Sequence, residues 1–182
     1  MTAWRTTGHR GDALEDLITL SNEFYAKKNL CRIDKAATPI KVVEINEQGQ
    51  IIKAYFEKKA TVDFFGAVQG IPIAFDAKET DLKNLPLYNL HAHQLEYMEQ
   101  FTAQKGLAFL IVHFKFNDTF YLVPYEVLQE FSEGAKHGGR KSIPYSTMEE
   151  QFRIQRSNSG ILHFLPILNA YLEYKEARIS KK

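Results

Sequence analysis

The stretch 61–80, TVDFFGAVQGIPIAFDAKET, decides the fold of this chain. Its apolar runs predict two strands, 61–68 and 71–77, because the Gln-Gly pair between them is a turn signal. Few polar residues interrupt the two runs, which is typical of strands that are buried. The stretch therefore predicts a β-hairpin in the interior of the protein.

Charged residues interrupt both strands of this hairpin. Asp63 falls in the first strand, and Asp76 and Lys78 share one face of the second, because side chains alternate along a strand. Two carboxylates can hold Mg²⁺ or Mn²⁺, and a nearby lysine can activate water or neutralise charge on phosphorus. The pattern indicates metal-assisted phosphodiester hydrolysis; the alternative is that the acids cap turns or pair with Lys78.

Six short motifs add to this pattern, in this order: HRG at 9–11, AYF at 54–56, TVD at 61–63, FDAKET at 75–80, HAHQ at 91–94 and GRKSI at 139–143. With them the chain resembles the RecU-type Holliday-junction resolvases of the PD-(D/E)XK nuclease superfamily. The resemblance spans residues 8–145. It implies an α/β, single-domain restriction-endonuclease-like fold, with a central mixed β-sheet flanked by helices and a projecting β-hairpin stalk.

The same resemblance implies roles for individual residues. Lys78 would stabilise the transition state, and Mg²⁺ or Mn²⁺ would be held by Thr61, Asp63, Asp76 and Gln94. The family usually has Glu where this chain has Asp76, so we expect the preferred ion or the rate to differ. The HAHQ motif is unsuited to zinc, because histidines two apart do not share a helix face. His91 and His93 would contact DNA or support the site, or they cap the helix.

The activity that the resemblance implies is the cutting of four-way DNA junctions during homologous recombination and DNA repair. A junction has two strands to cut, so one active site per chain implies a symmetric homodimer. Recombinase and branch-migration proteins are further partners to be expected. Two alternatives stay open: a non-catalytic junction-binding or recombinase-modulating protein, and a related nuclease acting on other branched or duplex DNA.

Composition restricts the DNA-binding surface to local patches, because the 182-residue chain has a net charge of only +1. Segment 40–59 is predicted to be a hairpin, and the resemblance makes it a stalk that enters the junction; the alternative is an ordinary meander packed on the core. Basic and aromatic residues are the candidate DNA contacts: Arg10, Lys53, Tyr55, Phe56, Lys58, Lys59, Arg140 and Lys141. The hairpin is short for the family.

The remaining elements follow from periodicity and turn signals. We expect helices at 12–28, 91–105, 125–131 and 161–174, and strands at 29–35, 107–114 and 119–123. The segments without regular structure are expected to be a loose arm at 1–10, a loop at 81–90, a flexible basic stretch at 132–142 and a frayed tail at 175–182. Glu15 lies on the first helix, where it either supports the metal site or stabilises the helix end.

One domain is expected, because 45% of the residues are hydrophobic and no linker interrupts them. There is a single cysteine, no apolar run long enough to span a membrane and no signal peptide at 1–10. A cytoplasmic protein without membrane contact is the expectation.

Overall fold

The computed structural model describes residues 12–57 and 61–180. Its centre is a mixed sheet with the strand order β1-β4-β5-β7-β8-β10. Only β5 and β7 run parallel, whereas the other neighbours are antiparallel. The strands are β1 (Arg32–Lys35), β4 (Phe64–Val68), β5 (Ile71–Thr80), β7 (Leu107–Phe114), β8 (Thr119–Pro124) and β10 (Arg153–Ile154).

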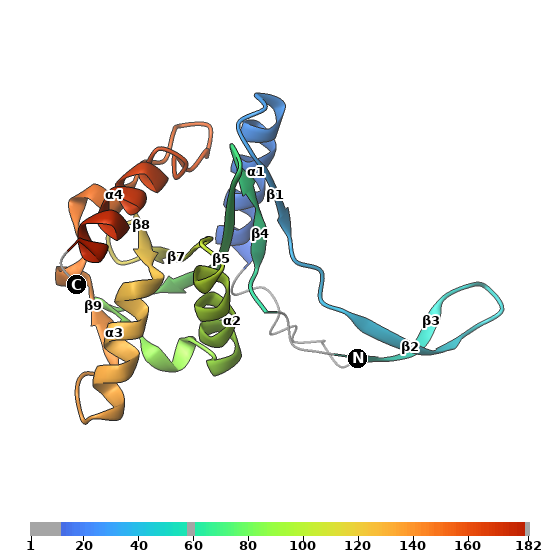
Figure 1. Ribbon diagram of the computed structural model, residues 1–182. Helices are drawn as coiled ribbons and strands as arrows, with labels where there is room; N and C mark the ends of the chain where they lie inside the picture. Colours follow the sequence, from blue (N-terminus) through green and yellow to red (C-terminus); the bar gives the residue numbers. More distant parts are fainter. Residues whose placement is uncertain (1–11, 58–60, 181–182) are drawn as a thin grey trace.

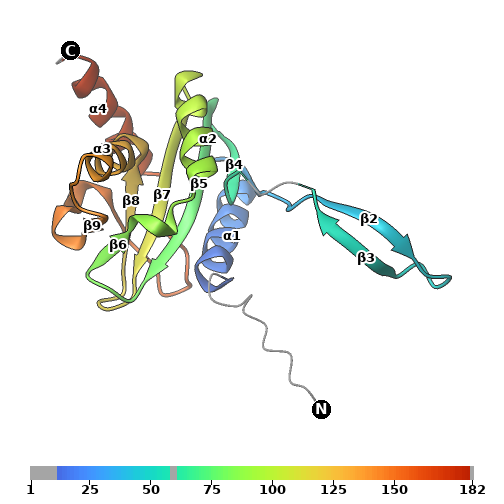
Figure 2. The same cartoon turned by 90° about the horizontal axis from the view of Figure 1, so that it is seen from below.

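Helices cover both faces of this sheet (Figures 1 and 2). They are α1 (Asp12–Lys27), α2 (Ala92–Ala103), α3 (Tyr125–Lys136) and α4 (Ile167–Ile179). Side chains of α1 and α4 pack in one apolar cluster, and those of α2 and α3 pack in a second cluster on the other face. The expected α/β architecture, a mixed sheet between helices, is confirmed.

An aromatic stack holds the central strands together on the α1 and α4 face. Phe75 on β5 stacks on Phe64 of β4 at 5.1 Å and on Phe109 of β7 at 4.7 Å between ring centroids. Tyr171 of α4 meets Phe109 edge-on. All four rings are buried, so the register of three strands and the position of α4 depend on one another.

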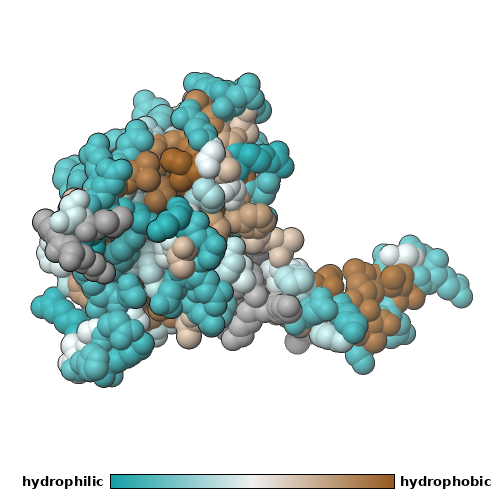
Figure 3. Space-filling model, viewed as in Figure 1, coloured by the Kyte–Doolittle hydropathy of each residue, from teal (hydrophilic) through white to brown (hydrophobic). Residues whose placement is uncertain are grey.

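The projecting hairpin is also present. Strands β2 (Ile40–Ile45) and β3 (Ile51–Phe56) form a two-stranded sheet of their own, outside the central sheet. Every residue of both strands is exposed, and Figure 3 shows apolar side chains gathered on this projection. The ribbon therefore does not pack on the core as a meander would.

The hairpin of the opening stretch is present with shifted ends. Strand β4 begins at Phe64, so Asp63 lies directly before it and not within it. Strand β5 runs on to Thr80, because it pairs with β7 along its whole later part. The edge strand expected at 29–35 is shorter and begins at Arg32.

Two connections expected to be irregular contain structure. The loop at 81–90 holds strand β6 (Asn84–Pro86), which pairs with β9 (Ser142–Pro144), and then a 3₁₀ turn, Leu87–Asn89. Residues 132–136, expected to be flexible, are the last part of α3 instead. There Lys136 pairs with Glu133 one turn earlier, which supports the helix end.

The last helix lies further along the chain than expected. It starts at Ile167 after Pro166, a residue suited to a helix start, and it continues to Ile179. Arg178 donates to the Tyr174 hydroxyl at 2.8 Å and to Glu130 of α3, so most of the expected tail is helical. The arm at 1–10 lies outside the described residues, among which no helix is both long and apolar enough to cross a membrane.

Replacing Gly66 by alanine should weaken the sheet edge. A Cβ at this position in β4 would lie 2.0 Å from the carbonyl oxygen of Arg32 and 2.7 Å from Ile33 Cα, both backbone atoms of β1. We expect Gly66→Ala to lower the free energy of unfolding by about 1–3 kcal/mol, measured by urea denaturation.

Gly134→Ala is the control for this substitution. Gly134 lies inside α3, and a Cβ added there would meet no atom within 4 Å, so alanine should stabilise the protein by about 0.5–1 kcal/mol. Equal stability of the two variants would contradict the close approach of β1 and β4.

Candidate functional site

A fully buried carboxylate, Asp76, is the centre of the candidate site. Its Oδ1 accepts the backbone N–H of Asp63 at 2.8 Å. Its Oδ2 accepts from Lys78 Nζ at 2.6 Å and from Gln94 Nε2 at 2.5 Å. Burial of a charge is costly without partners, and here three donors from separate parts of the chain supply them.

Asp63 faces this carboxylate from the residue before β4. Its Oδ2 accepts the backbone N–H of Ala77 at 2.9 Å, while its own N–H donates to Asp76. The two acids are therefore tied to each other's strands by reciprocal bonds. This arrangement follows from the antiparallel register, in which Phe64 lies opposite Phe75.

The environment of Asp63 disfavours its ionised form. Burial, and next the negative charge of Asp76, raise its pKa from an ordinary 3.8 to about 6. The Ala77 N–H and the Lys78 ammonium act in the opposite direction but are weaker. A positive charge between the two acids would relieve this repulsion, and a carboxyl with a raised pKa of this kind is a candidate for a functional site.

The start of α2 fixes the orientation of Gln94. His91 is the N-cap residue, and its backbone carbonyl accepts the backbone N–H of Gln94 at 3.0 Å. In return, Gln94 Oε1 accepts the His91 backbone N–H at 3.2 Å, which leaves Nε2 to donate to Asp76. His91 therefore occupies the N-cap position that was expected as one alternative, and a DNA contact by His91 or His93 stays a prediction. The ring of His93 stacks on that of His91 at 5.5 Å between centroids.

Two other predicted site residues lie outside this hydrogen-bond network, as far as the described residues show. Thr61 is exposed, two residues before Asp63. Glu15 of α1 pairs with Lys35 of β1 at 2.7 Å. That ion pair joins α1 to the edge strand β1. Among the described residues no hydrogen bond links Glu15 to Asp63 or Asp76.

The candidate DNA contacts occupy two exposed places. Lys53, Tyr55 and Phe56 lie on β3 of the projecting hairpin, where Tyr55 is 51% and Phe56 75% exposed. Because they are consecutive in a strand, the two rings face opposite sides of the ribbon. Arg140 and Lys141 are exposed between α3 and β9. Arg10, Lys58 and Lys59 lie outside the described residues.

The donor set fits a hard divalent cation better than zinc. The two carboxylates supply oxygen ligands of the kind that Mg²⁺ and Mn²⁺ bind while keeping several waters, whereas Gln94 turns its Nε2, not its oxygen, toward Asp76. The described residues contain no group of three or more His, Cys, Asp or Glu that could hold a metal by themselves. The residues present therefore suit an ion that also takes ligands from water and substrate.

Comparison with known proteins gives a consistent result. The family model "RecU: Recombination protein U" matches residues 9–170. A protein named Holliday junction resolvase RecU from Oceanobacillus iheyensis is 36% identical to this chain, over 82% of this chain and 79% of that protein. One of the same name from Oenococcus oeni is 35% identical, over 88% of this chain and 85% of that protein. A third, from Leuconostoc citreum, is 36% identical over 92% and 84%. The solved structure of Archaeoglobus fulgidus Hjc, a Holliday junction resolvase, matches with a TM-score of 0.40 and 13% identity, over 64% of this chain and 73% of that one.

The raised pKa of Asp63 predicts a pH-dependent cost in stability. Below pH 3.8 the carboxyl is protonated in both folded and unfolded protein, and above about 6 it is ionised in both. Stability is therefore lost as the pH rises through this window, because ionisation is harder in the folded state. Asp63→Asn lacks this loss, so without divalent cations it should be more stable than the parent at pH 8 by on the order of 1–2 kcal/mol.

Thermal unfolding at a series of pH values in EDTA would measure the difference. It should shrink as the pH falls from 7 to 4, while Glu47→Gln at the exposed hairpin tip should follow the parent throughout. A constant difference across this range would show that Asp63 is not strained by its buried position.

Proposed function

Because this chain belongs to the RecU family, we propose that it is a Holliday junction resolvase, a structure-specific endonuclease acting in homologous recombination and DNA repair. The observation that carries the proposal is the network of Asp63, Asp76, Lys78 and Gln94, buried at one face of the sheet. It combines the paired acids and the lysine that phosphodiester hydrolysis requires. The chain spans most of the length of its relatives.

The proposed cofactor is Mg²⁺ or Mn²⁺. Asp63 and Asp76 would hold it, and Thr61 and Gln94 are the further candidates from the sequence. When bound, such an ion lowers the pKa of a coordinated water and stabilises negative charge on a phosphate. Asp63 has the oxygen best placed for this purpose, because no N–H group among the described residues donates to its Oδ1.

The side chains of the network have separate roles in this proposal. Gln94, fixed by the cap of α2, holds the Asp76 carboxylate in one orientation. Lys78 places an ammonium group beside the reacting phosphate, where it stabilises the charge that develops on the phosphoryl oxygens. Its side chain is 16% exposed, so it is not fully sealed from solvent.

Junction specificity would come from the projecting ribbon. Tyr55 and Phe56 face opposite sides of the ribbon. The two rings would therefore stack on different bases, or on bases of different arms of the junction, and would not stack on the same base. Lys53, with Arg140 and Lys141 on the main body, would contact phosphates. Readout of junction shape needs few base-edge contacts.

A homodimer is the proposed assembly, since two symmetric cuts need two active sites. The ribbon offers a surface for a second copy, because its exposed residues include Ile40, Val43, Ile45, Ile51 and Ile52. Apolar patches of this kind usually mark contact sites.

Recombinase and branch-migration proteins remain further proposed partners, and the cytoplasm is the proposed location.

Cleavage of synthetic DNA tests the proposed activity. With Mg²⁺ or Mn²⁺ the protein should introduce paired nicks into a four-way junction and leave a matched linear duplex intact. Asp63→Asn and Lys78→Met should each lower the cleavage rate by about 10²-fold or more, while junction binding persists. EDTA should abolish cleavage by the parent. Junction binding without cleavage under any metal would favour a non-catalytic protein, and equal cleavage of both DNAs would favour another nuclease.

Removing the two ribbon aromatics tests the source of specificity. Stacking on a base is worth about 1–3 kcal/mol, so Tyr55→Ala with Phe56→Ala should weaken junction binding by at least about fivefold. Affinity for linear duplex should change less, as measured by fluorescence anisotropy. Leu20→Ala, an exposed apolar residue on α1, is the control. Unchanged junction affinity in the double variant would exclude the aromatic pair from recognition.

A further inference from the structure

An aromatic ring on the face that holds the paired acids Asp63 and Asp76 is open to solvent. Phe65 follows Asp63 by two residues, so the alternation of side chains puts the two on one face of the sheet. Phe64 between them is buried in the opposite face, whereas Phe65 is 46% exposed. Single exposed apolar residues are ordinary on a protein surface, but this one is an aromatic group beside the proposed metal ligands.

The strand register fixes the surroundings of this ring. Phe65 lies opposite Ala74 of β5, two residues from Asp76. Arg32 of β1 lies opposite Ala67, which is two residues further along β4. Along the strands the order is therefore the two acids, then Phe65, then Arg32, with about 7 Å for each two-residue step. Helix α2 packs on β5 and β7, and β4 and β1 continue the sheet to its edge. The groups thus form one line that leads away from the acids.

Arg32 supplies hydrogen-bond donors for a phosphate on this line. Its neighbour Ile33 is buried in the opposite face, so Arg32 shares the face of Phe65, and its side chain is exposed. Asp34 orients the guanidinium through two bonds, from Nε at 2.9 Å and from Nη2 at 2.8 Å. A guanidinium has five N–H donors, so this pair leaves donors that can reach a phosphate oxygen.

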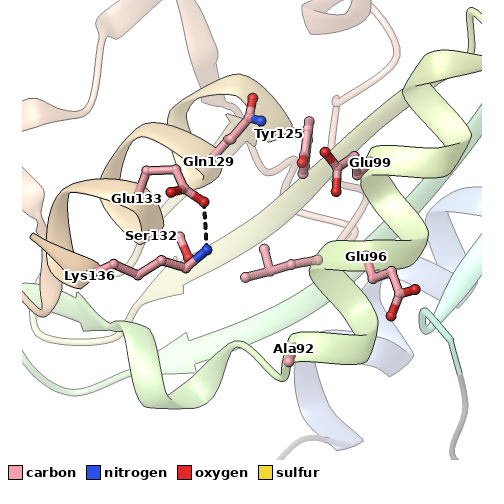
Figure 4. A pocket seen from close by; sticks show the side chains of 9 residues that line it. Ala92, Glu96, Glu99, Tyr125, Gln129, Ser132, Glu133 and Lys136 are labelled. Atoms are coloured by element: carbon pink, nitrogen blue, oxygen red, sulfur yellow. Dashed lines mark hydrogen bonds and ion pairs between the residues drawn. The ribbon is translucent and has the colours of Figure 1, made fainter.

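The other side of α2 is unsuited to DNA. A groove between α2 and α3 has three glutamates on its walls, against a single lysine that pairs with one of them (Figure 4). The four residues are Glu96, Glu99, Glu133 and Lys136. A surface with this excess of acids repels phosphates. The DNA strand that reaches the paired acids is therefore expected on the side of β4 and β1.

We propose that Phe65 stacks on the DNA base next to the scissile phosphate, while Arg32 holds a later phosphate of the same strand. Asp76 is fully buried, so a phosphate reaches the paired acids only by leaving the regular path of the DNA backbone. The base beside that phosphate is thereby drawn out of the helical stack, and the ring of Phe65 replaces the stacking that the base loses.

This inference rests on the proposed nuclease function and adds a determinant of junction specificity to it. Bases that are already unpaired or weakly stacked cost least to draw out of a duplex. A base at the branch point of a junction is therefore captured more easily by Phe65 than a base within linear duplex.

Binding of a synthetic four-way junction tests the proposal without relying on cleavage. Fluorescence anisotropy is measured with Ca²⁺, an ion that also takes oxygen ligands. Phe65→Ile keeps an apolar side chain suited to a strand but has no ring, so it should weaken binding at least about fivefold, whereas Phe65→Trp should not. Phe116→Ile is the matched control, since Phe116 is 39% exposed in the turn between β7 and β8.

Junctions with one missing base identify the contact. The base is removed from one nucleotide at a time on each side of the branch point. At one position its removal should weaken binding by the parent at least about fivefold and leave binding by Phe65→Ile unchanged, because the ring and the base act as a pair. Each comparison is made within one variant, so a small difference in stability between variants does not affect it.

Salt dependence tests the role of Arg32. Arg32→Gln should make the dependence of junction affinity on salt shallower by about one counterion, and an unchanged slope would exclude the phosphate contact. Equal losses for the parent and Phe65→Ile at every abasic position would overturn the stacking. So would parental affinity of Phe65→Ile, or a change of oligomeric state in this variant by light scattering, which would assign the ring to a contact between two copies. Absence of cleavage by the parent with Mg²⁺ would contradict the nuclease function instead.

Discussion

The positions of β4, β5 and α2 depend on one carboxylate, that of Asp76, which is buried without solvent contact. Asp76 is stable there only because Asp63, Lys78 and Gln94 donate to it, and these donors come from the residue before β4, from β5 and from the start of α2. The approach of β4, the packing of α2 and the rotamer of Lys78 are thereby coupled. Loss of any one donor leaves a partly unpaired charge in the interior, so the fold and the site depend on the same contacts.

Strand alternation links this polar face to the apolar one. Phe75 and Asp76 are neighbours in β5, and they point to opposite faces of the sheet. The register that stacks Phe75 between Phe64 and Phe109 also sets Asp76 opposite Asp63. A slip by one residue would exchange the two faces and destroy both. The geometry of the two acids therefore depends on the aromatic stack, which lies on the opposite face of the sheet.

The sequence was most informative where a residue's role depends on near neighbours. Apolar runs around the Gln69-Gly70 turn predicted the hairpin, period-two alternation predicted the shared face of Asp76 and Lys78, and period 3.6 predicted α1. The contact of Gln94 with Asp76 came only through family likeness, whereas the register that bonds Asp63 to Ala77 follows from the Gln69-Gly70 turn, which sets Val68 opposite Ile71. The short strands β6, β9 and β10 were missed because long-range pairing, not periodicity, forms them.

The isolation of the β2–β3 ribbon has an evolutionary consequence. All its strand residues are exposed, and within residues 12–57 and 61–180 its two strands pair only with each other, so the central sheet places no restriction on its length. Paired insertions near Asn46–Gln50 would extend it by about 3.3 Å for each residue added per strand, without repacking the core. Reach can then vary among descendants while the chemistry stays constant. The ribbon is in effect an exchangeable module, open to natural drift and to engineering alike.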